Sequence, residues 1–350
     1  MKSQYLKGLA SRVAFLIMMI RIQEAGAQVQ TSFWLGVSYF GALGDRTNPP
    51  HGPGFNVQRD LDHLGALGYK LIRVWATWDM PSPIAASLIL ADGSVNPGVL
   101  ERLKGLITYA DNKGLQVDLT FSYRKFTGPI GGTGFNAYKT GIANATRELK
   151  ASAYSNVIFD LCNECPLSPG QIRQLIDTVR SLHPGRKVFV SFSDPDPIHN
   201  VINIARKYNR LGRRLDYLAP HFFRNCSSAW ATQTRSRLNA FRMGLNPSYL
   251  AIPIYLQEEN RRHYAGDGCD SGPPRKGNGY EPSPNDFDTA SSQAQNNGAN
   301  SAQAWVLHTR AGFNLSAATL CRQLDPVELN LLYDLPCHRL GICLPRRPCP

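Results

Sequence analysis

Three polar residues stand at the ends of two apolar segments and could carry out acid–base chemistry. Asn163 and Glu164 follow segment 156–162, and Glu258 follows segment 250–257. If both segments are strands of one closed parallel sheet, their carboxyl ends meet at the same mouth and the two glutamates face each other. Two carboxyl groups about 5 to 5.5 Å apart can serve as acid/base and nucleophile in breaking a glycosidic bond with retention of configuration.

The elements that must position these residues are visible as a regular alternation along the chain. Eight apolar segments rich in β-branched and aromatic residues predict strands buried on both faces, as in a parallel sheet: 33–39, 70–76, 115–121, 156–162, 187–192, 215–222, 250–257 and 302–308. Segments with apolar residues at three- and four-residue steps predict the helices between them: 56–67, 97–111, 136–149, 169–182, 198–208, 230–241, 286–297 and 326–333.

This alternation predicts an α/β fold, a (β/α)8 TIM barrel in a single domain. A doubly wound sheet is the main rival, but no glycine-rich phosphate loop follows the first expected strand. We expect the barrel to occupy residues 28–334. Residues 335–350 are rich in cysteine and proline and are expected to form an irregular tail on the barrel surface.

The first 27 residues have the layout of a secretory signal peptide. Basic residues precede the apolar run 13–20, and Ala25-Gly26-Ala27 follows as a small-x-small cleavage pattern. This pattern predicts a secreted or periplasmic protein, with an uncleaved anchor or a buried amphipathic helix as alternatives. No apolar run reaches the length needed to cross a bilayer, so we expect no stable membrane insertion.

The distribution of charge bears on whether the protein binds nucleic acid. With 43% hydrophobic residues the chain can bury a core, and its net charge of +12 is spread over scattered residues without a nucleic-acid motif. We therefore expect no nucleic-acid partner.

The eight cysteines could pair after export. Cys226 and Cys269, in neighbouring loops, form one hypothetical pair. Cys162 and Cys165 lack the second pair that a structural zinc site needs, so they either clamp the loop around Glu164 or simply pack.

In these motifs the sequence resembles the clan A glycoside hydrolases, most closely the family 5 cellulase-like enzymes. The resemblance covers nearly the whole mature chain, although only a few short motifs in it are specific. It implies that Glu164, after Asn163, is the acid/base and that Glu258, after a Pro-hydrophobic run, is the nucleophile. An acid/base must hold a proton at rest, so the pKa of Glu164 should be raised, whereas Glu258 should stay ionised.

The resemblance also implies substrate-binding residues around the pair. Arg73 on the second expected strand would lie beneath the nucleophile, and His221 would follow the sixth. Asn163 would hydrogen-bond the sugar 2-hydroxyl. Trp305 on the eighth strand would offer a flat face to the sugar ring.

Two departures from the family pattern leave alternatives open. Family members often carry a Tyr two residues after the histidine, where Phe223 stands here. Tyr255 could replace its hydroxyl if the side chain pointed into the barrel, and Arg224 is another polar candidate. Glu259 follows Glu258 directly, and because a strand alternates sides only one of them can point to the axis. The spacing from Pro253 in the family favours Glu258.

The resemblance implies a retaining glycoside hydrolase that acts as a monomer on a β-linked polysaccharide or oligosaccharide of β-glucan or mannan type. It implies no metal and no organic cofactor. The alternatives are a barrel that binds glycans without cleaving them and a transglycosylase, which passes the sugar to an acceptor other than water.

Overall fold

The computed structural model describes residues 33–44, 57–77, 87–123, 134–151, 154–224, 226–262, 280–309 and 320–346. The expected signal peptide, residues 1–27, and Cys269 lie outside the described residues. Within the described part of the chain, no helix is both long enough and apolar enough to span a membrane.

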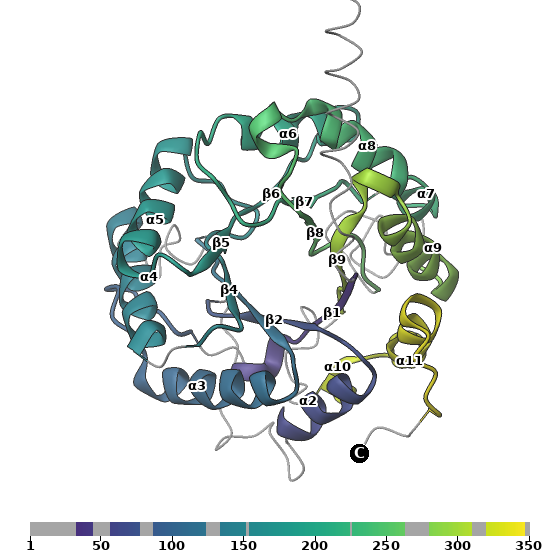
Figure 1. Cartoon of the computed structure of the whole chain (residues 1–350), viewed down its shortest axis with the longest axis horizontal. Helices are drawn as coiled ribbons and strands as arrows, with labels where there is room; N and C mark the ends of the chain where they lie inside the picture. Colours follow the sequence, from purple (N-terminus) through teal and green to yellow (C-terminus); the bar gives the residue numbers. More distant parts are fainter. Residues whose placement is uncertain are drawn as a thin grey trace, which may run out of the picture.

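Short parallel strands form a ring at the centre of the molecule (Figure 1). One sheet has the order β5-β4-β3-β2-β1-β9-β8, and a second contains β6 and β7. The bounds are β1 (Trp34–Ser38), β2 (Leu71–Trp75), β3 (Gln116–Thr120), β4 (Val157–Asp160), β5 (Lys187–Phe189), β6 (Ser191–Ser193), β7 (Ala219–His221), β8 (Ile254–Leu256) and β9 (Ala302–Leu307).

The two sheets make one closed barrel because β5 and β6 are halves of a single barrel strand. β5 pairs with β4, β6 pairs with β7, and a bridge between Leu218 and Ile254 joins β7 to β8. Strands of a closed barrel are tilted and staggered, so one strand can meet its two neighbours over different stretches. The expected strand 187–192 is therefore interrupted at Val190. The predicted (β/α)8 barrel is confirmed.

Helices surround the strand ring (Figure 1). They are α2 (Val57–Ala66), α3 (Pro97–Asn112), α4 (Gly134–Ala151), α5 (Pro169–Leu182), α6 (Asn200–Asn209), α7 (Ala229–Thr232), α8 (Thr234–Gly244), α9 (Pro284–Gln295), α10 (Leu320–Gln323) and α11 (Pro326–Leu340), with 3-10 turns η1 (Phe40–Leu43), η3 (Pro247–Tyr249) and η4 (Gly298–Asn300). Four of them, α3, α5, α9 and α11, begin with a capping side chain followed directly by proline. A proline there loses nothing, because its missing N–H would have no partner within the helix.

The last helix is longer than the sequence suggests. The expected helix 326–333 continues to Leu340 and ends at Gly341 in the left-handed conformation, so the part of the tail before Gly341 is helical. Pro336 lies inside this helix and has no N–H to donate to the carbonyl of Leu332. The hydroxyl of Tyr69 donates to that carbonyl instead, at 3.2 Å.

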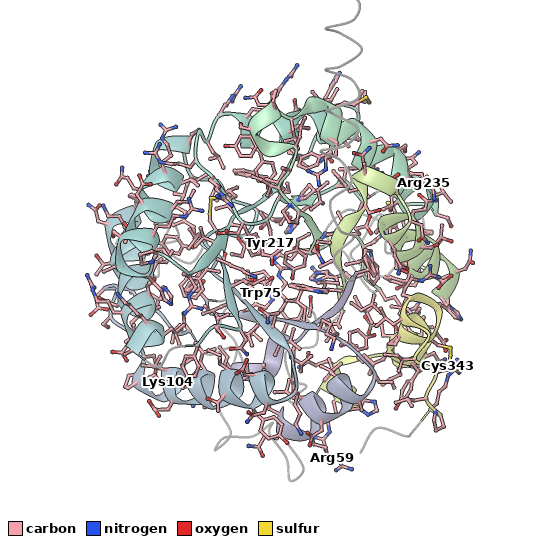
Figure 2. The ribbon with its side chains drawn as sticks, viewed as in Figure 1. Arg59, Trp75, Lys104, Tyr217, Arg235 and Cys343 are labelled. Atoms are coloured by element: carbon pink, nitrogen blue, oxygen red, sulfur yellow. A yellow bond between two sulfur atoms is a disulfide. The ribbon has the colours of Figure 1, made fainter. Side chains whose placement is uncertain are left out.

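Buried side chains form two layers, one between strands and helices and one inside the barrel. The inner cluster consists of Leu71, Ile158, Phe189, Tyr217, Ala219, Tyr255, Ala304 and Val306. Figure 2 shows the side chains that fill this interior, with Tyr217 near the axis. Trp305 and Leu307 belong to the outer layer, so residues along β9 alternate between the two sides.

The described cysteines are all in disulfides. Cys162 is bonded to Cys165, and Cys337 is bonded to Cys343. Cys226 is also disulfide-bonded, but its hypothetical partner Cys269 lies outside the described residues.

Candidate active site

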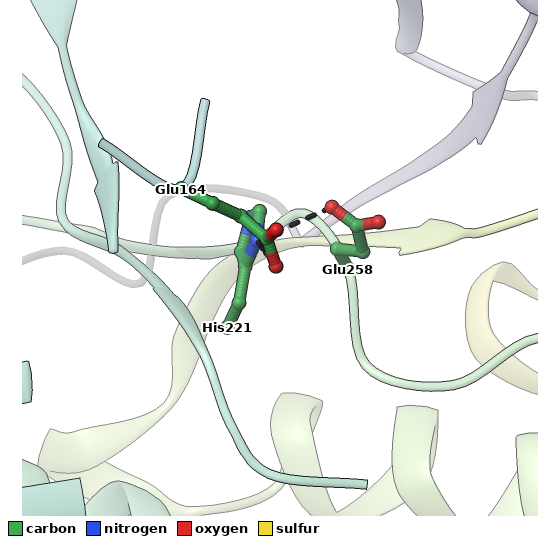
Figure 3. A group of neighbouring side chains, drawn as sticks. All are labelled: Glu164, His221 and Glu258. Carbon is green, nitrogen blue, oxygen red and sulfur yellow. Dashed lines mark hydrogen bonds and ion pairs between the residues drawn. The ribbon is translucent and has the colours of Figure 1, made fainter. Parts of the chain in front are cut away.

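The two predicted glutamates meet at the carboxyl ends of the strands. Glu164 follows β4 and Glu258 follows β8, while His221 is the last residue of β7. One carboxylate oxygen from each glutamate and a ring nitrogen of His221 all lie within 4.8 Å of one another (Figure 3). The structure therefore brings together residues that are far apart in the sequence.

Glu258 is buried among four nitrogen-bearing side chains. Its Oε2 lies 3.2 Å from Arg73 Nη1 and 3.2 Å from His221 Nδ1. Its Oε1 lies 2.8 Å from His308 Nε2 and 3.2 Å from Arg224 Nη2. Burial alone would raise the pKa of Glu258, but His308, His221 and Arg73 outweigh it and hold the pKa well below its usual range. Glu258 is thus ionised at rest, as expected of a nucleophile.

Arg73 contacts the Glu258 carboxylate. It is fully buried on β2 and donates through Nη1 to Glu258, through Nε to Thr120 at 3.1 Å and through Nη2 to Asn163 Oδ1 at 2.7 Å. Asn163 is thereby oriented with its carbonyl toward Arg73. Its Nδ2 makes no hydrogen bond to any residue that the structure describes.

Glu164 is more accessible than Glu258. Its side chain is 21% exposed, and Oε1 lies 3.5 Å from His221 Nδ1. Burial and the charge of Glu258 raise the pKa of Glu164, but His221 and Arg224 overcome both, so the pKa is lowered. The raised pKa expected of an acid/base is therefore not found at Glu164.

A buried polar network supports His221 from below. His221 Nε2 lies 2.9 Å from Gln257 Oε1, and Gln257 Nε2 donates to Asp118 Oδ2 at 2.6 Å. Tyr255 points into the barrel, but its hydroxyl donates to Asp118 at 2.7 Å and its side chain is only 1% exposed. The expectation that Tyr255 binds substrate is therefore wrong, because its hydroxyl is used in the barrel interior.

Trp305 cannot serve as the expected sugar platform. It is 1% exposed, and its indole N–H donates to Glu259 Oε2 at 2.5 Å on the side of β9 that faces the helices. Glu259 also accepts from Thr234 of α8 at 2.8 Å. Of the two adjacent glutamates, only Glu258 faces Glu164 and His221, as the family spacing suggested.

His308 is a site residue that the sequence reading missed. It follows β9 directly, and its Nδ1 lies 3.0 Å from Ser38 Oγ while its Nε2 contacts Glu258. Burial lowers the pKa of His308 to about 3, although Glu258 opposes this, so the imidazole is neutral at neutral pH. Ala304 and Val306 face the barrel interior, and the two-residue period of a strand places His308 on the same side. That period was the signal available in the sequence.

Arg224, the other polar candidate near His221, contacts the nucleophile position directly. Its Nε donates to the carbonyl of Glu259 at 2.5 Å, and its Nη2 reaches Glu258. Glu164, His221 and Glu258 also have the spacing of a metal-ligand group. Two arginines against one of these carboxylates disfavour a bound cation there.

Comparison with known proteins gives structural relatives only. No family model matches the sequence, and no curated protein matches it. A family 5 mannosidase from Rhizomucor miehei, in complex with mannosyl-fructose, superimposes with a TM-score of 0.59 at 12% identity, over 89% of this chain and 94% of that one. A broad-specificity endoglucanase from an uncultured bacterium does so with a TM-score of 0.56 at 14% identity, over 89% and 95%. The fold is that of the family 5 glycoside hydrolases.

An exo-β-1,4-mannosidase from Opitutaceae bacterium strain TAV5 is also similar in structure, with a TM-score of 0.56 and 14% identity. The match covers 89% of this chain but only 60% of the mannosidase. At these identities the similarity establishes the fold alone.

Proposed function

We propose that the protein is a retaining glycoside hydrolase in which Glu164 is the acid/base and Glu258 the nucleophile. The observation that carries this proposal is the meeting of the two carboxylates at the barrel mouth, with oxygens within 4.8 Å. This spacing is close to the roughly 5 to 5.5 Å of retaining enzymes and too short to admit the water of an inverting one.

The reaction would proceed in two displacements. A Glu258 oxygen attacks the anomeric carbon while the bond to the leaving oxygen breaks and that oxygen takes the proton of Glu164. The glycosyl ester that forms removes the negative charge of Glu258. The pKa of Glu164 then falls further, and its carboxylate can accept a proton from the water that releases the sugar. Both steps use only carboxylates, so the mechanism requires no metal or organic cofactor.

The surrounding residues have separate roles in this scheme. Arg73 keeps Glu258 ionised before the attack and orients Asn163 through its carbonyl. The Asn163 amide N–H groups are then available to the sugar 2-hydroxyl, a contact that strengthens in the transition state. His221 stands between the two carboxylates and is held by Gln257.

We propose a β-linked glucan or mannan, as polymer or oligosaccharide, as the substrate. The similar structures described as mannosidase and endoglucanase support this class. The disulfides support export to an oxidising compartment, which fits a polysaccharide substrate outside the cell.

Release of reducing ends from β-1,4-glucan, β-1,3-glucan, mannan and xylan tests the proposal. The wild type should act on at least one polymer with retention, measured by NMR of the first product. Glu258→Ala should abolish this activity, whereas Glu101→Ala, the same change at an exposed glutamate on α3, should leave it intact. Full activity in Glu258→Ala would refute the assignment.

A barrel that binds glycans without cleaving them is the second candidate. It is favoured by the lowered pKa of Glu164, which leaves no obvious proton donor at neutral pH, and by the contacts on both oxygens of Glu258. Glu164→Gln separates the two functions, because an enzyme loses turnover while a binding protein keeps its affinity. A transglycosylase would instead form transfer products when an acceptor sugar is added.

A further inference from the structure

A disulfide encloses the candidate acid/base in a very small ring. The bond between Cys162 and Cys165 joins the residues on either side of Asn163 and Glu164, with the two cysteine Cα atoms 4.9 Å apart. Only two residues separate the bonded cysteines, and both belong to the site. The backbone from which the Glu164 side chain leaves is therefore constrained covalently at both ends.

The backbone of Glu164 has an unusual conformation. Its φ is 44°, and it is the single non-glycine residue with a positive φ in the described part of the chain. An L-residue avoids this region because its Cβ crowds the following carbonyl oxygen. Such a conformation persists where the surroundings impose it, and it is often found at functional sites.

Hydrogen bonds fix the same turn to the barrel. The N–H of Asn163 donates to the carbonyl of Phe121 at 2.8 Å. The N–H of Glu164 donates to Ser191 Oγ at 3.1 Å, and the N–H of Cys165 donates to the Ser191 carbonyl at 3.0 Å. The turn is thus tied to the segment after β3 and to β6, and its orientation relative to the barrel mouth is defined.

The rate of proton transfer from Glu164 depends on where its carboxyl group lies relative to the leaving oxygen. Proton transfer to a leaving oxygen needs heavy atoms about 2.6 to 3.2 Å apart, and a displacement of about 1 Å can cost a factor of 100 in rate. Glu258 is held by four side chains from three separate segments of the chain. Glu164 lies at the end of a turn, where the backbone conformation sets the direction of its side chain.

We propose that Cys162 and Cys165 are positioning residues, whose disulfide holds Glu164 in the left-handed conformation that aims its carboxylate at the glycosidic oxygen. The inference rests on the proposed function and deepens it. It assigns to this disulfide a part in acid catalysis in addition to any contribution to stability.

The test compares leaving groups in the double variant Cys162→Ser/Cys165→Ser. Phenyl β-glycosides need acid assistance, whereas 2,4-dinitrophenyl β-glycosides leave without a proton. We expect kcat/KM to fall about 100-fold for the phenyl substrate and less than about threefold for the dinitrophenyl one. The matched control Cys337→Ser/Cys343→Ser, which removes the disulfide at the end of α11, should change neither value.

Several outcomes would overturn the inference. An equal loss on both substrates would indicate general damage, and no loss would show that the disulfide does not position Glu164. Circular dichroism checks the fold, and Cys162→Ala/Cys165→Ala replaces the serine variant if buried hydroxyls prevent folding. Mass mapping of non-reduced wild-type peptides provides a further check, since free thiols at these positions would refute the proposal outright.

Amide hydrogen exchange keeps this inference separate from the proposed function. If the wild type hydrolyses no glycoside, the proposed function fails, but the positioning role can still be decided. Faster exchange at the amides of positions 164 and 165 in the double variant, with unchanged exchange at Tyr255 on β8, would support it. Unchanged exchange at these two amides would refute it.

Discussion

Glu258 shares its two oxygens among four side chains, while Glu164 meets the same His221 from the other side of the site. The two carboxylates have different surroundings, but the pKa of each is shifted in the same direction. The pKa of Glu258 lies well below its usual range, and the pKa of Glu164 is lowered to a smaller extent. Their order is the one that catalysis requires, since the nucleophile loses its proton before the acid does.

Hydrolysis should therefore be fastest in acid. The active form has Glu258 ionised and Glu164 protonated, and it is depleted as the pH rises through the lowered pKa of Glu164. Above about pH 5 we expect kcat/KM to fall about tenfold per pH unit, because the usual pKa of glutamate is about 4.3. A pH profile of kcat/KM from 3 to 8 measures this, and a plateau extending to pH 7 would contradict it.

Among the single elements, β9 shows how the alternation of side chains along a strand decides which residues can reach the site. Ala304 and Val306 face the barrel interior, Trp305 faces the helices, and His308 reaches the site just beyond the strand. A tryptophan on this strand can match a family motif and still lie on the wrong side for a ligand.

Trp305→Phe distinguishes a core role from a sugar platform. The change leaves the buried Glu259 carboxylate without its indole donor, so the free energy of unfolding should fall by about 1–3 kcal/mol. Urea unfolding measures this loss. KM for the polymer should stay within about twofold, because the ring is buried between β9 and the helices. A large rise in KM at unchanged stability would restore the platform role.

The contact between Tyr69 and α11 can be tested with a double-mutant cycle. Tyr69→Phe removes the donor to the Leu332 carbonyl and should lower the free energy of unfolding by about 1 kcal/mol. In a Pro336→Ala background the helix regains its own N–H for that carbonyl, so the same change should cost less. Equal costs in both backgrounds would show that the hydroxyl does not replace the missing N–H.

Apolar runs were sufficient to predict the strands, because strands buried on both faces leave a continuous signal in the sequence. The break at Val190 leaves no such signal, since it arises from the pairing of one strand with two different neighbours. Within the site, Asn163-Glu164 and Glu258 could be placed from their position after strands. The contact of Arg224 with Glu258 could not, because it depends on the path of a loop.

For the whole molecule, buried acids in the barrel interior link stability to pH. Asp118 is fully buried beside Arg73 and Tyr255, and burial raises its pKa to about 6. Its folded pKa lies above the unfolded value of about 3.9, so the stability it contributes is complete below that pH and is lost as the pH rises through about 6. The lowered pKa of Glu258 acts in the opposite sense and removes stability as the pH falls below about 4.

We therefore expect the melting temperature to be highest near pH 4 to 5 and to decline toward neutral pH. The loss attributed to Asp118 is on the order of 3 kcal/mol. Melting temperatures across pH 3 to 8 measure the trend, and Asp118→Asn should flatten it between pH 4 and 6. A decline that is identical in the variant would assign it to other groups.

The pairing of β1 with β9 joins the first described strand to the last one, with Leu35 opposite Trp305. A chain synthesised or exported from its N-terminus leaves β1 and β8 as unpaired edge strands until residues 302–307 have emerged. Ring closure therefore waits for the last strand. Fragments that stop before residue 302 would contain both Glu164 and Glu258 but would leave the edges of β1 and β8 unpaired. Premature termination of the chain is therefore an aggregation hazard for this protein.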